Sequence, residues 1–293
     1  MGVIERDPHT GHGTTGHEWN GIKELNTAVP WPVWAFLIAA FAFALTWWVL
    51  MPSWPLGTTY TKGLLGADER QTVAAGLRAA AERRADWTGR IGKEDFAAIR
   101  SNPALMTDVR QAGHALFGDN CAACHGVGAK GGTGFPDLTD RAWLWGGSPD
   151  AILQTLRVGV NSEHADSRVS QMPAWGRDGM LKDDAIRNVV AYVYSLSHPG
   201  TARDALGGDA AAGKVVFSAN CSACHGAGAK GDHKMGAPDL TDHFWLYGGD
   251  EAAIYESVYN GRQGHMPTWD KRLTPVERKI LALYILDLGR GAQ

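Results

Sequence analysis

Cysteine and unbalanced charge are both scarce in this sequence. Its 293 residues include only four Cys, which are too few for a fold held together by disulfides. The 28 Lys and Arg side chains are matched by 31 Asp and Glu, so there is no basic excess to bind a nucleic-acid backbone. The rest of the composition is close to the globular average, which excludes collagen-like, low-complexity and fully disordered chains. At about 150 residues per domain, the length allows about two domains.

Charged residues are absent from positions 25–61, and an apolar run lies inside this stretch. Val33 to Met51 comprises 19 residues with Thr46 as the only polar side chain, and as a helix it would extend roughly 28 Å, about the thickness of a bilayer core. Trp and Pro residues stand at both ends, as is typical of membrane interfaces and helix ends. About 30 residues with four acidic side chains precede the run and no small-residue cleavage pattern follows, which favours a retained anchor over a signal peptide.

The flanks of this run set the limits of the N-terminal part. We predict an N-terminal segment over residues 1–28, a transmembrane helix within 29–54 and a spacer over 55–107. Lys and Arg counts near the two ends of the run are equal, so the positive-inside rule does not orient the helix. Within the spacer, Ala67 to Asp86 is rich in Ala, Arg and Glu, and predicts a helix with Asp68 as its N-cap. This helix is either a solvated spacer or a docking helix.

The rest of the chain is an internal duplication. Gly113 to Gly126 (GHALFGDNCAACHG) matches Gly213 to Gly226 (GKVVFSANCSACHG), and a PDLTD, an aromatic-rich and a Met-Pro-x-Trp segment follow in the same order in both copies. Each copy closes with an apolar helical pattern. Two copies of about 90 residues indicate two tandem domains rather than a solenoid. We place them at residues 108–199 and 208–293, joined by a linker over 200–207.

All four cysteines lie in the repeated C-x-x-C-H segments, which are the attachment signature of c-type haem. Two thiols one helical turn apart can form thioethers with the two vinyl groups of one porphyrin, and the adjacent His then supplies the proximal nitrogen to the iron. The predicted haem-binding residues of these segments are Cys121, Cys124 and His125 in the first copy and Cys221, Cys224 and His225 in the second. The sequence therefore predicts two covalently bound haem c groups.

Other uses of C-x-x-C fit this pattern less well. Zinc ribbons place their two C-x-x-C pairs about 15 to 20 residues apart, far closer than Cys124 and Cys221. A thioredoxin-like dithiol needs no His after the second Cys and is expected within a βαβ pattern, which the sequence lacks. Disulfides within the two motifs would leave both His residues unexplained.

A Met-Pro segment precedes the last helix of each copy and offers the sixth ligand to each iron. Met172 and Met266 occupy the same position in the repeat, and Met/His ligation raises the reduction potential of a haem. Met180 and Met235 are rival candidates without a counterpart in the other copy. We therefore predict Met172 and Met266 as axial ligands of the haem irons together with the two His. Each Met can serve the haem of its own copy or that of the other copy, and the sequence does not distinguish these two cases.

Further residues suit packing around a haem. Gly113 and Gly213 permit close crossing of the first helix of each copy by the last helix, through Tyr192 or Tyr284. Four aromatic residues can pack on haem edges or reach a propionate, and core packing accounts for them equally well: Trp143, Trp145, Trp245 and Tyr247. Arg157 and Arg262 are weaker candidates for propionate partners. We interpret the His residues without a repeated pattern as surface or loop residues: His114, His164, His233, His243 and His265.

The two C-x-x-C-H copies resemble tandem class I cytochrome c domains. With the short stretch Trp19 to Asn26 and the Trp-flanked span, the whole chain resembles the membrane-anchored dihaem subunit (subunit III) of the cbb(3)-type, C-family haem-copper cytochrome c oxidases. The resemblance implies an all-α fold, with one N-terminal transmembrane helix followed by two cytochrome c domains. It also implies a bacterial inner membrane with both haems in the periplasm, an orientation that c-type attachment outside the cytoplasm likewise requires.

The resemblance implies an electron-transfer subunit of a respiratory terminal oxidase, which accepts electrons from a donor cytochrome c. The electrons would pass through both haems to the monohaem and catalytic subunits of an oxygen-reducing, proton-translocating complex. We expect no catalytic residues in this chain, because it lacks a His cluster for copper and both irons are expected to be six-coordinate. The expected partners are these oxidase subunits, the donor and the lipid bilayer, with no nucleic acid. Two alternatives stay open: a stand-alone anchored dihaem carrier for another dehydrogenase or reductase, and a dihaem peroxidase.

Overall fold

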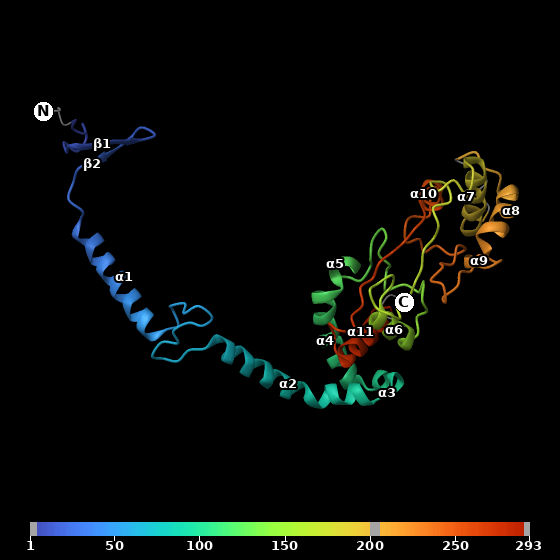
Figure 1. Cartoon of the computed structure of the whole chain (residues 1–293), viewed down its shortest axis with the longest axis horizontal. Coiled ribbons are helices and arrows are strands. Elements are labelled where there is room, and N and C mark those ends of the chain that lie inside the picture. Colours follow the sequence, from blue (N-terminus) through green and yellow to red (C-terminus); the bar gives the residue numbers. More distant parts are fainter. Residues whose placement is uncertain (1–4, 200–205, 290–293) are drawn as a thin grey trace. The chain divides into compact units, whose positions relative to one another are not determined.

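The structure, a computed structural model, describes residues 5–199 and 206–289. Most of the predicted linker over 200–207 lies outside the described residues. The chain forms two compact units, residues 1–83 and 84–293, and each is described by itself. Helices make up most of the regular structure in both units (Figure 1).

The first unit contains an antiparallel hairpin of β1 (Thr14–Trp19) and β2 (Ile22–Leu25). Asn20 and Gly21 between the strands have φ angles of 49° and 87°, the left-handed pair that a type I′ turn requires. These two strands depart from the all-α fold that the sequence predicts. The fold is therefore helix-rich rather than helical throughout.

The apolar run forms α1 (Trp31–Leu50), a helix of 20 residues. Pro30 is its N-cap, and the helix ends just before Pro52. None of its residues is buried in the structure, and its one hydroxyl is satisfied because Thr46 donates to the Ala42 carbonyl at 2.8 Å. With a mean hydropathy of 2.1, α1 is long and apolar enough to cross a membrane.

α2 (Glu69–Lys93) begins at the predicted N-cap. The Asp68 carboxylate accepts hydrogen bonds from two backbone N–H groups of the first turn, at 3.1 and 3.2 Å. The helix continues past the predicted end at residue 86. In the second unit its last turns and α3 (Phe96–Ser101) contribute Ile91 and Ile99, both fully buried, to an apolar core.

The second unit repeats one series of four helices. The first series is α4 (Pro103–Asn120), α5 (Ala122–His125), α6 (Pro149–Val158) and α7 (Asp183–Ser197). The second series is α8 (Ala210–Asn220), α9 (Ser222–His225), α10 (Glu251–Asn260) and α11 (Pro275–Leu288). Five of these helices start at a residue whose side chain accepts a hydrogen bond from the first turn: Asn102, Ser148, Asp209, Asp250 and Thr274.

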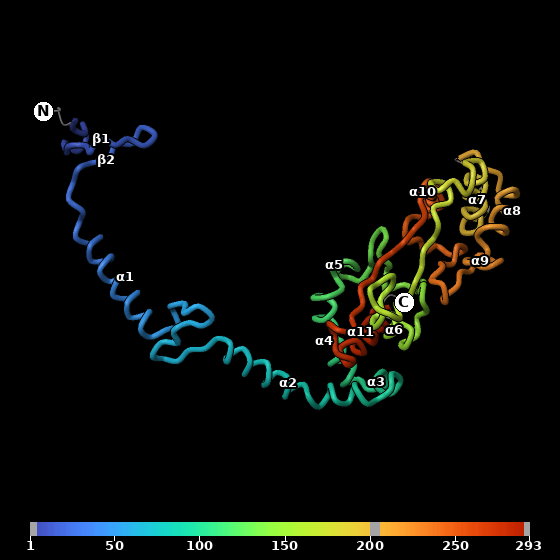
Figure 2. The backbone as a smooth tube through the Cα atoms, in the orientation of Figure 1, coloured from blue at the N-terminus to red at the C-terminus, as the bar shows by residue number. Residues whose placement is uncertain are grey.

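The last helices of the two series are exchanged. α11 packs against α4 and α6 of the first series, whereas α7 packs against α8 and α10 of the second (Figures 1 and 2). A Cβ added to Gly113 on α4 would lie 2.5 Å from the Cβ of Tyr284 on α11. A Cβ added to Gly213 on α8 would lie 1.9 Å from the carbonyl oxygen of Asn188 and 2.9 Å from the Cβ of Tyr192, both on α7. In both cases the close crossing at glycine is made with the last helix of the other copy.

Two apolar clusters result from this exchange. The first cluster is built around α4, α6 and α11, with Phe117 and Leu281 among its buried residues. The second cluster is built around α7, α8 and α10, with Val189, Phe217 and Ile254. Each core therefore combines residues of both repeats.

Backbone hydrogen bonds between the two copies hold this arrangement just after α6 and just after α10. After α6, Val160 and Met266 exchange two backbone hydrogen bonds of 2.9 Å. After α10, Arg262 and Met172 exchange two bonds of 2.8 and 3.1 Å. Each predicted Met ligand is thus paired with the residue that follows the third helix of the other copy.

The chain passes between the two clusters over residues 161–171 and again over 263–265. Asn161 ties these crossings together, because its amide nitrogen donates to the Ser170 carbonyl at 2.8 Å and to the Gly264 carbonyl at 2.7 Å. One side chain therefore fixes both crossing segments to each other.

Candidate functional site

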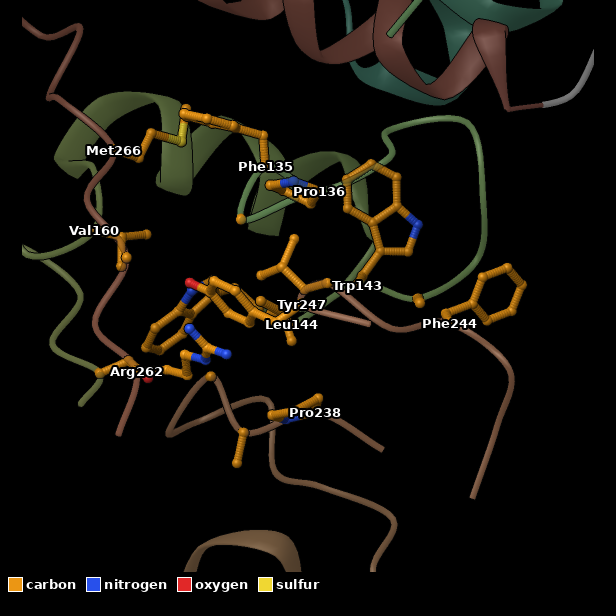
Figure 3. Close-up of a pocket in the computed structure, with 18 of the residues that line it drawn as sticks. Phe135, Pro136, Trp143, Leu144, Val160, Pro238, Phe244, Tyr247, Arg262 and Met266 are labelled. Atoms are coloured by element: carbon orange, nitrogen blue, oxygen red, sulfur yellow. The ribbon is translucent and has the colours of Figure 1, made fainter. Parts of the chain in front are cut away.

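A cavity of about 1230 Å³ lies in the second unit, and every predicted haem-binding residue lines it. These residues are Cys121, Cys124, His125, Met172, Cys221, Cys224, His225 and Met266. Part of the wall appears in Figure 3, where Met266 and Val160 lie on one side of the cavity and Tyr247 and Leu144 project between them and Pro238. The structure therefore joins the two expected sites into one continuous cavity.

Each C-x-x-C-H segment is a short helical turn that follows the first helix of its series. Cys121 ends α4 and begins α5, and the backbone N–H of His125 donates to its carbonyl at 2.9 Å. The second copy repeats this geometry, with His225 donating to the Cys221 carbonyl at 3.0 Å. The turn brings both thiols and the imidazole of a motif to the same wall of the cavity.

The His residues of the two C-x-x-C-H segments are oriented by equivalent backbone groups. Nδ1 of His125 lies 3.1 Å from the Pro136 carbonyl oxygen, and Nδ1 of His225 lies 3.1 Å from the Pro238 carbonyl oxygen. Since a carbonyl only accepts, Nδ1 holds the proton and the Nε2 lone pair is free for a metal. Burial lowers the pKa of both imidazoles, so their neutral form is favoured. A neutral imidazole with a fixed tautomer is the form that ligates iron.

The four cysteines lie within the described residues, and all are free thiols there. Burial, with a smaller contribution from the second thiol of the same motif, raises the pKa of Cys121 and of Cys221 to about 11. Within the described residues no group of three or more His, Cys, Asp or Glu side chains could hold a metal ion, so the geometry there offers no ligand set for a thiolate metal site.

The two predicted Met ligands stand in opposite clusters. Met172 packs against the second cluster, which also contacts Cys221. Met266 packs against the first cluster, which contains Cys121. Each Met therefore lies with the C-x-x-C-H segment of the other copy, which is the alternative that the sequence leaves open.

The unpaired polar groups of the cavity fit a haem. The four aromatic residues singled out from the sequence all line it: Trp143, Trp145, Trp245 and Tyr247. The indole nitrogen of Trp245 is buried and has no hydrogen-bond partner within the described part of the chain. Buried N–H groups are nearly always paired, so this donor calls for an acceptor such as a propionate carboxylate.

Of the remaining candidate haem-contacting residues, some line the cavity and others lie outside it. Arg262 lines the cavity, whereas Arg157 lies outside it and pairs with Asp166 at 3.5 Å. Met180 and Met235 are both exposed, and only Met235 reaches the cavity wall. Three His residues interpreted as surface or loop residues also line the cavity: His233, His243 and His265.

Sequence reasoning missed two residues that organise this region, Asn161 and Arg168. The Arg168 guanidinium lies 5.0 Å from the centre of the Trp145 ring, as that of Arg262 lies 4.3 Å from the Tyr247 ring. A signal for Arg168 was present, because both arginines stand four residues before a predicted Met ligand. Asn161 has no counterpart in the second copy that could have singled it out, and its role becomes visible only where its side chain bonds the two crossing segments.

Comparisons with known proteins agree along the whole chain. Residues 108–193 and 208–285 match the family model described as cytochrome C oxidase, cbb3-type, subunit III, and residues 11–58 match the N-terminal domain of cytochrome oxidase-cbb3, FixP. The chain is 47% identical over 288 residues to the Cbb3-type cytochrome c oxidase subunit FixP of Bradyrhizobium diazoefficiens, with 98% of both chains covered. It is 42% identical over 295 residues to subunit CcoP of Azospirillum sp. strain B510, with 98% of both covered. Its identity to subunit CcoP of Cereibacter sphaeroides is 40% over 280 residues, with 95% of both covered.

Proposed function

Because this chain belongs to the family of subunit III of the cbb3-type cytochrome c oxidases, we propose that it is the membrane-anchored electron-transfer subunit of such an oxidase. It accepts electrons from a donor cytochrome c and passes them to the monohaem and catalytic subunits. The observation that carries this proposal is the single cavity lined by two C-x-x-C-H segments and two Met-Pro segments.

The chain holds two haems in two class I cytochrome c domains. When bound, haem c supplies a reversible one-electron carrier. The first haem is attached at Cys121 and Cys124 and the second at Cys221 and Cys224. Backbone carbonyls at Pro136 and Pro238 orient the two proximal His residues, as the distances of 3.1 Å to Nδ1 indicate.

The distal ligands are crossed between the copies. Met266 completes the site of His125, and Met172 completes the site of His225. The packing of each Met on the cluster of the opposite copy supports this assignment, as does the pairing of each Met with the residue after the third helix of that copy. With two protein ligands for each iron, neither site offers an open position for a substrate, which suits electron transfer rather than catalysis.

Single-haem variants of the full-length protein test this crossing. Ala at Cys221 and Cys224 leaves only the haem attached to the first copy. In that background we expect Met266→His to abolish the near-infrared band of Met-ligated ferric haem and Met172→His to leave it unchanged. The reverse result would contradict crossed ligation, and the loss of the band in neither variant would contradict Met ligation itself.

The anchor holds these domains at a bacterial inner membrane. α1 has the length and hydropathy of a span, and covalent haem attachment takes place outside the cytoplasm, so the haem domains lie in the periplasm. The hairpin of β1 and β2 then lies on the cytoplasmic side.

Gentle detergent extraction followed by identification of the bound proteins tests the function as a whole. We expect this chain to copurify with an integral haem-copper oxidase and to be reoxidised by oxygen in that preparation. The same extraction from cells that lack the chain serves as the control for non-specific copurification. Isolation free of every oxidase subunit would contradict the proposal and favour a stand-alone dihaem carrier.

A further inference from the structure

Val160 and Arg262 occupy equivalent positions in the two halves of the second unit, that is, in the first and the second copy of the repeat. Each follows a glycine at the end of the third helix of its series, Gly159 or Gly261, and both glycines have a φ angle of 70°. A Cβ on Gly159 would lie 2.4 Å from the Met266 carbonyl oxygen, and one on Gly261 would lie 2.5 Å from that of Met172. The backbone is therefore similarly confined in both halves, and the side chain at the next position is Val in one and Arg in the other.

The Arg262 side chain is held at the wall of the cavity. Its Nε donates to the hydroxyl of Ser257 at 3.0 Å, and its guanidinium lies 4.3 Å from the centre of the Tyr247 ring. Figure 3 shows the guanidinium beside this ring. Within the described residues its terminal nitrogens make no hydrogen bond, so a fixed cation presents free donors to the cavity. A planar guanidinium in this position suits a carboxylate.

The arginine of the other half is used differently. Arg168 also stacks on an aromatic ring, that of Trp145, at 5.0 Å. However, its terminal nitrogen donates to the Ala151 carbonyl at 3.1 Å, and the residue lies outside the cavity wall. The position equivalent to Arg262 holds the uncharged Val160. At this position the two halves therefore differ in the charge that they present to the cavity, which Arg141 and Arg272 also line.

We propose that Arg262 makes the two haem sites electrically unequal, by binding a propionate carboxylate of the haem whose distal ligand is Met172. This inference rests on the proposed function. Reduction adds one negative charge to a haem site, and a nearby fixed cation favours the reduced state by Coulomb attraction that a half-buried site screens only weakly. Arg262 therefore raises the reduction potential of the haem attached at Cys221 and Cys224 above the value that this site would have without it.

Redox titration of the full-length, detergent-solubilised protein and its Arg262→Gln variant tests this inference. At a fixed potential we expect the oxidised-to-reduced ratio of one haem to rise about tenfold, which corresponds to about 59 mV for a one-electron couple, and that of the other haem to stay unchanged. The haem that responds must be the one whose spectrum changes in Met172→His. Arg262→Lys keeps the charge and should recover part of the shift.

Arg168→Gln is the matched control, because it removes another arginine that stacks on an aromatic ring but does not line the cavity. We expect it to leave both potentials within a small fraction of the Arg262→Gln shift. Unchanged potentials in Arg262→Gln, an equal shift of both haems, or an equal effect of Arg168→Gln would overturn the inference. If neither Met172→His nor Met266→His alters the spectrum, the proposed ligands themselves are wrong, which is a separate failure from that of Arg262.

Discussion

Replacing Gly213 with Ala tests the exchanged packing of α7 on α8. The added Cβ would lie 1.9 Å from the carbonyl oxygen of Asn188 and 2.5 Å from its carbonyl carbon, and these backbone atoms cannot rotate away. The two helices must separate by about 1.5 Å to restore ordinary contact. A clash with backbone atoms lies at the upper end of the range that overpacking costs, about 2–3 kcal/mol, while Ala gains about 1 kcal/mol over Gly in a helix. We therefore expect a net loss of about 1–2 kcal/mol of unfolding free energy.

Thermal unfolding of the full-length, detergent-solubilised protein, followed by circular dichroism in the haem absorption band, measures this loss. For a unit of this size each kcal/mol shifts the Tm by about 2–4 °C, so the expected decrease is about 2–8 °C. Gly118→Ala is the matched control on α4, because no atom lies within 4 Å of the added Cβ, and helix propensity then predicts a small increase. A Gly213→Ala protein that unfolds at or above the temperature of the unsubstituted protein would refute the close crossing of α7 and α8.

Removal of α11 by a stop codon should affect the first haem site and spare the second, because α11 belongs to the first cluster; near-infrared spectra should show Met ligation only at the haem of His225. Arg110→Ala removes a pair with Asp287 that joins α4 and α11 at 2.7 and 3.2 Å. The Arg110 side chain is exposed, so we expect only a small loss of unfolding free energy that shrinks at high salt, as measured by unfolding at two salt concentrations. Burial raises the pKa of the Asp140 carboxyl above its ordinary value of 3.8, so ionisation at neutral pH weakens the folded state. Asp140→Asn should therefore raise the Tm at pH 7, and this gain should vanish as the pH falls through the Asp140 pKa towards the ordinary value.

The geometry of the two C-x-x-C-H segments was predictable because it is local, whereas their binding of haem stays a prediction. Cys121, Cys124 and His125 lie on one turn, so the contiguous motif fixes their relative positions wherever the turn is placed. The apolar run that forms α1 was predictable for a similar reason, since length and composition alone decide whether a helix can span a bilayer. The family resemblance drawn from these features is confirmed by the matches along the chain.

The exchange of α7 and α11 was not predictable from the same pattern. Tyr192 and Tyr284 stand at equivalent places in similar apolar helices, so either helix can cover either glycine as far as the local sequence goes. Which helix covers which glycine depends on the distance that residues 161–171 and 263–265 can span and on the contacts that these two crossing segments make with each other. Those contacts join residues that are far apart in the sequence, so no periodic pattern of apolar residues predicts them.

The hairpin was missed although its signal was present. Asn20-Gly21 is a strong indicator of a type I′ turn, and it lies between two short segments that pair as β1 and β2. The strands carry mostly polar, exposed residues without a clear alternation of apolar side chains, so the turn was the only strong local indication.

The exchange of α7 and α11 restricts how the two C-x-x-C-H segments can move relative to each other. In a simple tandem protein each domain completes its own core, and a linker between them permits hinge motion. Here each core is completed by a helix of the other copy, and Asn161 bonds the two crossing segments at 2.8 and 2.7 Å. Separation of the sites would expose the apolar faces of α7 and α11 and break the backbone pairs at Met172 and Met266. If the chain carries two haems as proposed, electron transfer between them would take place at a separation fixed by the fold rather than by encounters between mobile domains.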